Sequence, residues 1–159
     1  MFMVNTVGKD TSVALKSYIA GFLDADGAIM APVERHKEKK FKLRIRVIVR
    51  VTQKDREILL MFKESLGIGQ VVPDRSCFNW IIRDQNHVKW LLEILLPYIC
   101  VKRKQALIGL KIISSPRGTK EDLVKIALLA DSLSSLNVRS KLAQNSYSLK
   151  VQNVFSRND

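Results

Sequence analysis

Two aspartates, two residues apart, end a stretch of small and apolar residues near the start of the chain. The stretch runs from Tyr18 to Gly27 as YIAGFLDADG, and its carboxylates are Asp24 and Asp26. A helix C-terminus carries partial negative charge, so two carboxylates there are unfavourable unless a cation compensates them. Magnesium prefers carboxylate and carbonyl oxygens and would suit this position. A bare DADG is otherwise typical of a turn, and both interpretations stay open at this point.

Small residues occupy one side of the same stretch. Gly21 and Ala25 are four residues apart, so a helix over this segment places them on one face, where another helix can approach closely. If that helix comes from a second copy of the chain, two Asp26 carboxylates lie side by side. Gly21 and Ala25 are therefore predicted to be dimer-interface residues.

Basic residues dominate the charged side chains. The 159-residue chain has 27 Lys and Arg against 15 Asp and Glu, a formal net charge of +12. A surface of this sign attracts polyanions, and nucleic acid is the expected partner; simple solubility and an anionic membrane surface are the alternatives. The longest apolar stretch, residues 90–101, is far shorter than the roughly 20 residues of a bilayer span, so we expect no segment in a membrane.

Two further features of the chain concern its compartment and its metal content. The N-terminus does not resemble a secretory signal, so we expect the protein inside a cell, in the cytoplasm of a prokaryote or in an organelle. The two cysteines, Cys77 and Cys100, lack the spacing of a zinc site.

The positive charge is concentrated in residues 35–56, within which FKLRIRVIVRVTQ alternates apolar residues with mostly basic ones. This alternation predicts one strand over residues 41–53 with a buried face and a basic face. The positions predicted to be buried are Phe41, Leu43, Ile45, Val47, Val49 and Val51. The outward residues predicted to contact DNA are Arg44, Arg46 and Arg50.

Hydrophobic periodicity places the other elements around this strand. Helices are expected at residues 12–24, 55–66, 86–96, 102–113 and 119–134, and strands at 28–33, 70–72 and 78–83. Gly27 is predicted to end the first helix in a left-handed conformation, Gly67 is predicted to end the second helix, and Thr119 with Asp122 resembles a capping box. The predicted fold class is α+β: an αββαββα core whose antiparallel four-stranded sheet is backed by helices, plus C-terminal helices.

The expected domain organisation is a single domain over residues 1–159. Its core spans about 11–134, and the polar tail, 137–159, could be helical, irregular or disordered. The sheet would leave one positive face open, and β-ribbons are narrow enough to enter the DNA major groove. The strands expected at 70–72 and 78–83 would form a second hairpin, and its DNA-contacting candidates are Gln70, Arg75, Asn79 and Arg83.

The segment IAGFLDADG, residues 19–27, resembles the LAGLIDADG signature of homing endonucleases. The likeness continues through VTQK at 51–54, GIGQV at 67–71, and VKRKQA with LKII within 101–113, as in single-motif members found in mobile introns. The resemblance implies a homodimer that binds double-stranded DNA and cleaves a long pseudo-palindromic target by metal-dependent phosphodiester hydrolysis.

The same resemblance implies roles for individual residues. Asp26 would be the metal ligand with the carbonyl of Ala25 beside it, two or more Mg²⁺ ions being shared between the subunits. Gln53 corresponds to a residue of the active-site water network and Lys102 to a basic residue near the scissile phosphate. The alternatives are an RNA maturase that assists group I intron splicing, which would not need Asp26, and a non-catalytic DNA-binding regulator, against which Asp26, Gln53 and Lys102 together argue.

Overall fold

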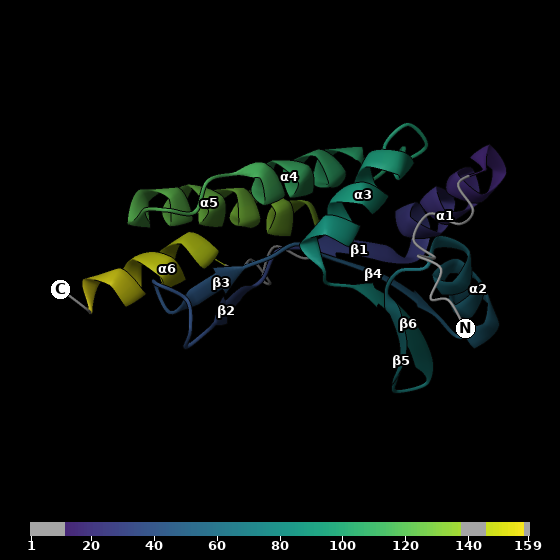
Figure 1. Ribbon diagram of the computed structural model, residues 1–159, viewed down its shortest axis with the longest axis horizontal. Coiled ribbons are helices and arrows are strands. Elements are labelled where there is room, and N and C mark those ends of the chain that lie inside the picture. Colours follow the sequence, from purple (N-terminus) through teal and green to yellow (C-terminus); the bar gives the residue numbers. More distant parts are fainter. Residues whose placement is uncertain (1–11, 138–145, 158–159) are drawn as a thin grey trace, which may run out of the picture. The chain divides into compact units, whose positions relative to one another are not determined.

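The computed structural model describes residues 12–137 and 146–157. The helices are α1 (Val13–Asp26), α2 (Arg56–Leu66), α3 (Gln85–Leu95), α4 (Arg103–Ser114), α5 (Lys120–Asn137) and α6 (Tyr147–Ser156) (Figure 1). The strands are β1 (Gly27–Met30), β2 (Val33–Arg35), β3 (Leu43–Ile45), β4 (Ile48–Gln53), β5 (Gln70–Asp74) and β6 (Cys77–Ile82). Among the described residues, no helix combines the length and the apolar character that crossing a membrane requires.

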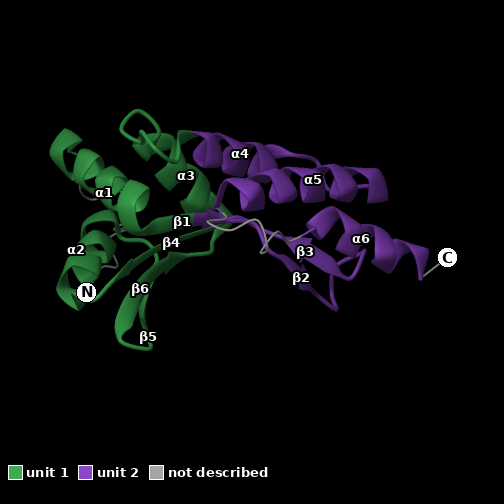
Figure 2. Cartoon of the chain, turned by 180° about the vertical axis from the view of Figure 1, so that it is seen from behind, with its two compact units in different colours: residues 1–28, 48–103 green, residues 29–47, 104–159 purple. Residues whose placement is uncertain are grey.

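The predicted fold class is confirmed. A four-stranded antiparallel sheet has the strand order β1-β4-β6-β5, and β2 pairs with β3 in a separate two-stranded sheet. The described residues fall into two compact units (Figure 2). One unit contains α1, β4, α2, β5, β6 and α3, and the other contains β2, β3, α4, α5 and α6; the boundary lies within β1.

The prediction of one continuous strand over residues 41–53 is wrong, because the chain leaves one sheet after Ile45 and enters the other at Ile48. The predicted inward positions from Leu43 to Val51 are buried, as expected from the alternation, whereas Phe41 is only partly buried. The interruption coincides with Val47, Ile48 and Val49, three successive apolar residues that are all buried. The predicted strand 28–33 is also interrupted, just before Val33, at Pro32, whose nitrogen has no hydrogen for a sheet hydrogen bond.

The predicted role of Gly27 is also wrong. Its φ is −99° and its ψ is 168°, so it is extended and begins β1, while α1 continues through Asp26. A Cβ on Gly27 would lie 2.6 Å from the carbonyl oxygen of Leu23. Glycine is therefore needed here because of a close approach to the preceding helical turn, and a left-handed conformation plays no part.

Other predicted helix ends are confirmed. Asp55 caps α2, and Gly67 ends it with a φ of 69°. At the start of α5, the Asp122 amide donates to the Thr119 hydroxyl and the Thr119 amide donates to the Asp122 carboxylate, as in a capping box. Of the polar tail, residues 147–156 form α6, the helical alternative, whereas 138–145 lie outside the described residues.

The core of the first unit lies between its sheet and the helices α1 and α2, which pack against the strands. The Phe62 ring of α2 contacts the Trp80 ring of β6, with centroids 5.7 Å apart, and both side chains are fully buried. Val49 and Val51 of β4 are buried as well. Because side chains alternate along a strand, the residues between them, Arg50 and Thr52, lie on the opposite face of the sheet. In Figures 1 and 2 the β5–β6 hairpin projects away from α1 and α3.

Candidate active site and nucleic-acid interface

Helix α1 is held by one apolar side and leaves another side exposed. The Ser12 hydroxyl accepts a hydrogen bond from the Leu15 amide and caps the helix. Ile19, Ala20 and Leu23 are buried. Three aromatic rings, those of Tyr18, Phe22 and Phe62, meet edge to face beside them. The helix is thereby fixed in the first unit, and its last residue, Asp26, reaches an exposed position.

The structure brings together two of the predicted catalytic residues. The Gln53 Nε2 donates a hydrogen bond of 2.6 Å to the Asp26 Oδ2. Gln53 is the last residue of β4 and Asp26 the last residue of α1, so both side chains sit where an element ends. The bond holds one carboxylate oxygen of an exposed aspartate in a fixed position.

Asp24 has different contacts. Its carboxylate accepts hydrogen bonds from the backbone amides of Cys100, at 2.8 Å, and Lys102, at 2.9 Å. The Lys102 Nζ donates to the backbone carbonyl of Asp24. A cation on the last carbonyls of a helix stabilises its C-terminus, so Lys102 supplies part of the compensation that the sequence pattern led us to expect. Lys102, predicted to be catalytic, is thus held at the same helix end as Asp26, because its contact residue Asp24 lies two residues before Asp26.

The predicted interface residues Gly21 and Ala25 are exposed. They line a shallow hollow of about 310 Å³ on the surface of α1. Its other lining residues are Ser17, Tyr18, Phe22 and Asp26. Apart from the backbone of α1 itself and the two residues that flank Gly21, no atom of the described residues comes within 4 Å of a Cβ built on Gly21. This side of the helix is therefore open to a partner.

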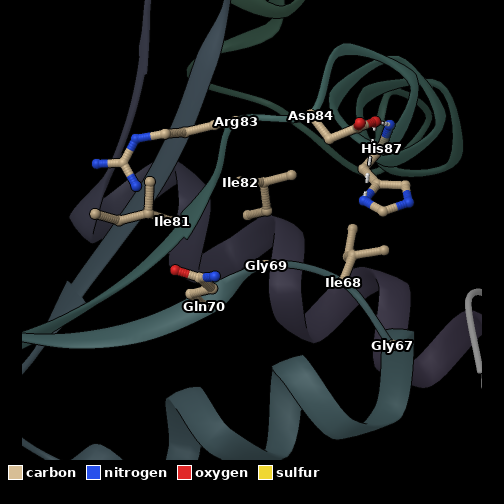
Figure 3. Close-up of a pocket in the computed structure, with 9 residues that line it drawn as sticks. All are labelled: Gly67, Ile68, Gly69, Gln70, Ile81, Ile82, Arg83, Asp84 and His87. Atoms are coloured by element: carbon tan, nitrogen blue, oxygen red, sulfur yellow. Dashed lines mark hydrogen bonds and ion pairs between the residues drawn. The ribbon is translucent and has the colours of Figure 1, made fainter.

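The open face of the first unit's sheet carries several predicted DNA contacts. Arg50 of β4, Ile81 of β6 and Gln70 of β5 are lateral neighbours in register. Arg75 lies between β5 and β6, at the hairpin turn, and is exposed with a φ of 56°. Gln70 and Arg83 line a surface pocket of about 350 Å³ beside the start of α3, with Asp84 and His87 (Figure 3).

Asn79, also predicted to contact DNA, is only 4% exposed. Its Oδ1 accepts a hydrogen bond of 2.5 Å from the Thr52 hydroxyl. Its Nδ2 donates a hydrogen bond of 2.9 Å to the Asp74 Oδ2. The sequence pattern did not single out Asp74. The signal was present, however, since Asp74 is the only carboxylate in β1, β4, β5 and β6.

Arg44 and Arg46 belong to the second unit, and both lie close to the carboxylate of Glu34, which the sequence pattern does not single out. Arg44 donates to the Glu34 Oε2 at 2.6 and 3.0 Å, and the Arg46 Nε lies 3.4 Å from the same oxygen. Burial alone would raise the pKa of Glu34. The hydrogen bond from Arg44 and the charges of both arginines outweigh that effect and lower the pKa. Glu34 therefore offsets part of the positive charge of this strand.

Comparisons with known proteins identify relatives of this chain. A family model described as LAGLIDADG endonuclease matches residues 19–114. The chain is 30% identical to the DNA endonuclease I-CreI of Chlamydomonas reinhardtii over 125 residues, covering 76% of this chain and 77% of that one. It is 34% identical to the DNA endonuclease I-CvuI of Chlorella vulgaris over 137 residues, covering 81% and 85%.

Solved structures are similar over most of the chain. A crystal structure of I-CvuI in complex with the I-CreI target matches with a TM-score of 0.80 and 30% identity, covering 89% of this chain and 92% of that chain. The archaeal intron-encoded homing endonuclease I-Vdi141I, complexed with DNA, matches with a TM-score of 0.77 and 21% identity, covering 89% and 94%, and supports the fold alone.

Proposed function

The chain belongs to the LAGLIDADG endonuclease family, and from this premise we propose that it is a homing endonuclease that cuts double-stranded DNA at a specific site. The observation that carries the proposal is the hydrogen-bonded pair of Asp26 and Gln53 at the exposed end of α1. This pair lies within the segment that matches the family model. The protein would act in the cellular compartment that holds its target DNA.

The oxygen donors at this helix end fit a divalent cation. The Asp26 carboxylate and the Ala25 carbonyl are hard ligands of the kind that Mg²⁺ prefers. The I-CvuI complexes were solved with Mg or Ca present. Among the described residues, no three His, Cys, Asp or Glu side chains come together to hold a metal. One chain thus offers only part of a site, and a second Asp26 would add the next carboxylate.

The proposed reaction is phosphodiester hydrolysis, in which one water adds to phosphorus and the 3′ oxygen leaves with a proton. A bound Mg²⁺ would supply Lewis-acid stabilisation of the negative charge that develops on the phosphate. Asp26 would hold the cation, and Gln53 would keep the carboxylate oriented through its 2.6 Å hydrogen bond. Lys102, fixed at the end of α1 by its contact with Asp24, would place a positive charge toward the phosphate.

The proposed active form is a homodimer joined through α1. The support is the open hollow over Gly21 and Ala25 and the single Asp26 that each chain provides. Two-fold symmetry would place one recognition sheet on each half of the target, which would therefore be pseudo-palindromic.

The test is cleavage of a pool of randomised DNA duplexes by the purified chain in Mg²⁺, with ends captured and sequenced. We expect cuts at one family of related, pseudo-palindromic sequences and none in EDTA. If the wild-type chain gives no cuts even after longer incubation but still binds RNA or DNA, the nuclease proposal fails. A maturase or a DNA-binding regulator would then be the better description.

A further inference from the structure

We propose that Asp74 is a base-reading residue and that Asn79 and Thr52 position it. The inference rests on the proposed function, because it concerns how the sheet of this endonuclease would select its DNA. It assigns to Asp74 the role that the sequence pattern had suggested for Asn79.

The first step is the burial of Asn79. This side chain is only 4% exposed, and both ends of its amide are engaged within the sheet. A DNA base could reach the amide only after Asp74 moved. Asn79 is therefore poorly placed to read a base edge itself.

The second step is the fixed direction of the hydrogen bonds. The Thr52 hydroxyl donates to Asn79 Oδ1, and Asn79 Nδ2 donates to Asp74 Oδ2, so the row crosses β4, β6 and β5 with one polarity. The exposed end of the row is a carboxylate, because Asp74 is solvent-exposed. Within the described part of the chain, no hydrogen bond reaches its second oxygen, Oδ1.

The third step is the face on which the row lies. Thr52 pairs in register with Asn79, and Asn79 pairs with Val72, two residues before Asp74. Because side chains alternate along a strand, Asp74 shares the open face with Arg50 and Gln70. On a surface of positive charge, a lone carboxylate opposes contact with phosphate and contributes nothing to non-specific affinity.

A carboxylate accepts hydrogen bonds and donates none. In the major groove it pairs with the amino group of cytosine or adenine, and it opposes the acceptors of guanine and thymine. We therefore expect Asp74 to select a base that presents an amino group at one position, repeated symmetrically in both half-sites.

The experiment compares base preferences of the wild-type chain, Asp74→Glu and Asp74→Asn on a randomised duplex pool in EDTA. Asp74→Glu keeps the charge but moves the carboxylate by one methylene. We expect each variant to lose at least fivefold of the preference at one symmetric pair of positions, since a correct base contact gives roughly 1–3 kcal/mol, or about 5- to 150-fold. Preferences elsewhere should remain.

Two matched variants complete the design. Glu93→Gln removes one negative charge from α3, outside the sheet, and should leave all preferences unchanged. Thr52→Val removes the hydroxyl that orients Asn79 and should weaken the same preference without changing the charge. Each variant's melting temperature is measured, and Asp74→Glu is decisive if Asp74→Asn unfolds.

Unchanged preference in Asp74→Glu, with uniformly tighter binding in Asp74→Asn, would overturn the inference and leave Asp74 as an electrostatic residue only. A wild-type chain that shows no sequence preference would overturn the proposed function instead. The two failures are therefore distinguishable.

Discussion

Two carboxylates at the end of α1 have different surroundings. Asp26 is exposed and accepts one hydrogen bond, from Gln53, so its loss should affect chemistry more than folding. We expect Asp26→Asn to bind target DNA and to show no measurable cleavage. Gln53→Ala should slow cleavage by roughly 10- to 100-fold, the usual cost of losing a side chain that orients a metal ligand. Single-turnover cleavage in Mg²⁺ measures both, and near-normal cleavage by Asp26→Asn would remove it from the site.

Asp24→Asn is the matched control for that substitution. The Asp24 carboxylate accepts two backbone amides of the loop that carries Lys102, and an asparagine can accept only with its single side-chain oxygen. We expect a loss of about 1–3 kcal/mol in the free energy of unfolding, measured by urea denaturation, whereas Asp26→Asn should cost much less. Equal stability of the two variants would contradict this division of roles.

At the same scale, residue types alone predicted which side chains belong to the candidate site but could not predict their partners. Asp26 and Gln53 are 27 positions apart, and their contact exists because a helix and a strand end at the same place. Asp24 was recognised only as a second carboxylate, because its partners are backbone amides, which every residue other than proline provides.

At the scale of elements, the passage from α1 into β1 depends on Gly27. A methyl group there would lie 2.6 Å from both the Leu23 carbonyl oxygen and the Leu23 side chain, although the extended φ and ψ suit any residue. We expect Gly27→Ala to destabilise the fold by about 1–3 kcal/mol, as overpacking typically does. Thermal unfolding measures this change. An unchanged melting temperature would contradict the prediction and show that the end of α1 shifts to make room for the methyl group.

The alternation of residues 41–53 predicted the buried positions from Leu43 to Val51 correctly, but it did not predict the burial of Ile48 or the path of the chain. Alternation reports which side of a strand faces the core, and it does not report which neighbouring strand is paired. Arg44 consequently pairs with Glu34 in the small sheet, while Arg50 lies in the large one.

This pairing provides a test for the role of Glu34 in DNA binding. Glu34→Gln removes the carboxylate that holds Arg44 and Arg46 and should free them to bind phosphates. We expect tighter binding to all duplexes and a salt dependence steeper by a slope of about 0.9 for each additional phosphate that is neutralised. Affinity titrations at several salt concentrations measure this slope. Glu93→Gln, which frees Lys89 on α3, is the control, and an equal change in both variants would assign the effect to net charge alone.

At the scale of the whole molecule, the proposed dimer depends on one face of α1. Gly21→Leu adds a large side chain at a position where, apart from the backbone of α1 and the flanking residues, no described atom lies within 4 Å of the Cβ, so a single chain should fold normally. Leucine is also a better helix former than glycine by nearly 1 kcal/mol. In a dimer, the same side chain would separate the two helices and their Asp26 carboxylates. We expect sedimentation to show that Gly21→Leu is a monomer. Its melting temperature should be no lower than that of an isolated wild-type chain, and it should not cleave DNA.

Val13→Leu is the matched control for Gly21→Leu. Val13 is also on α1 and 62% exposed, but it does not line the hollow over Gly21, so its replacement should preserve both the dimer and cleavage. A helix-wide loss of stability would affect both variants, whereas an interface through the hollow affects only Gly21→Leu. If Gly21→Leu cleaved both DNA strands as a monomer, α1 could not be the surface that brings two active sites together.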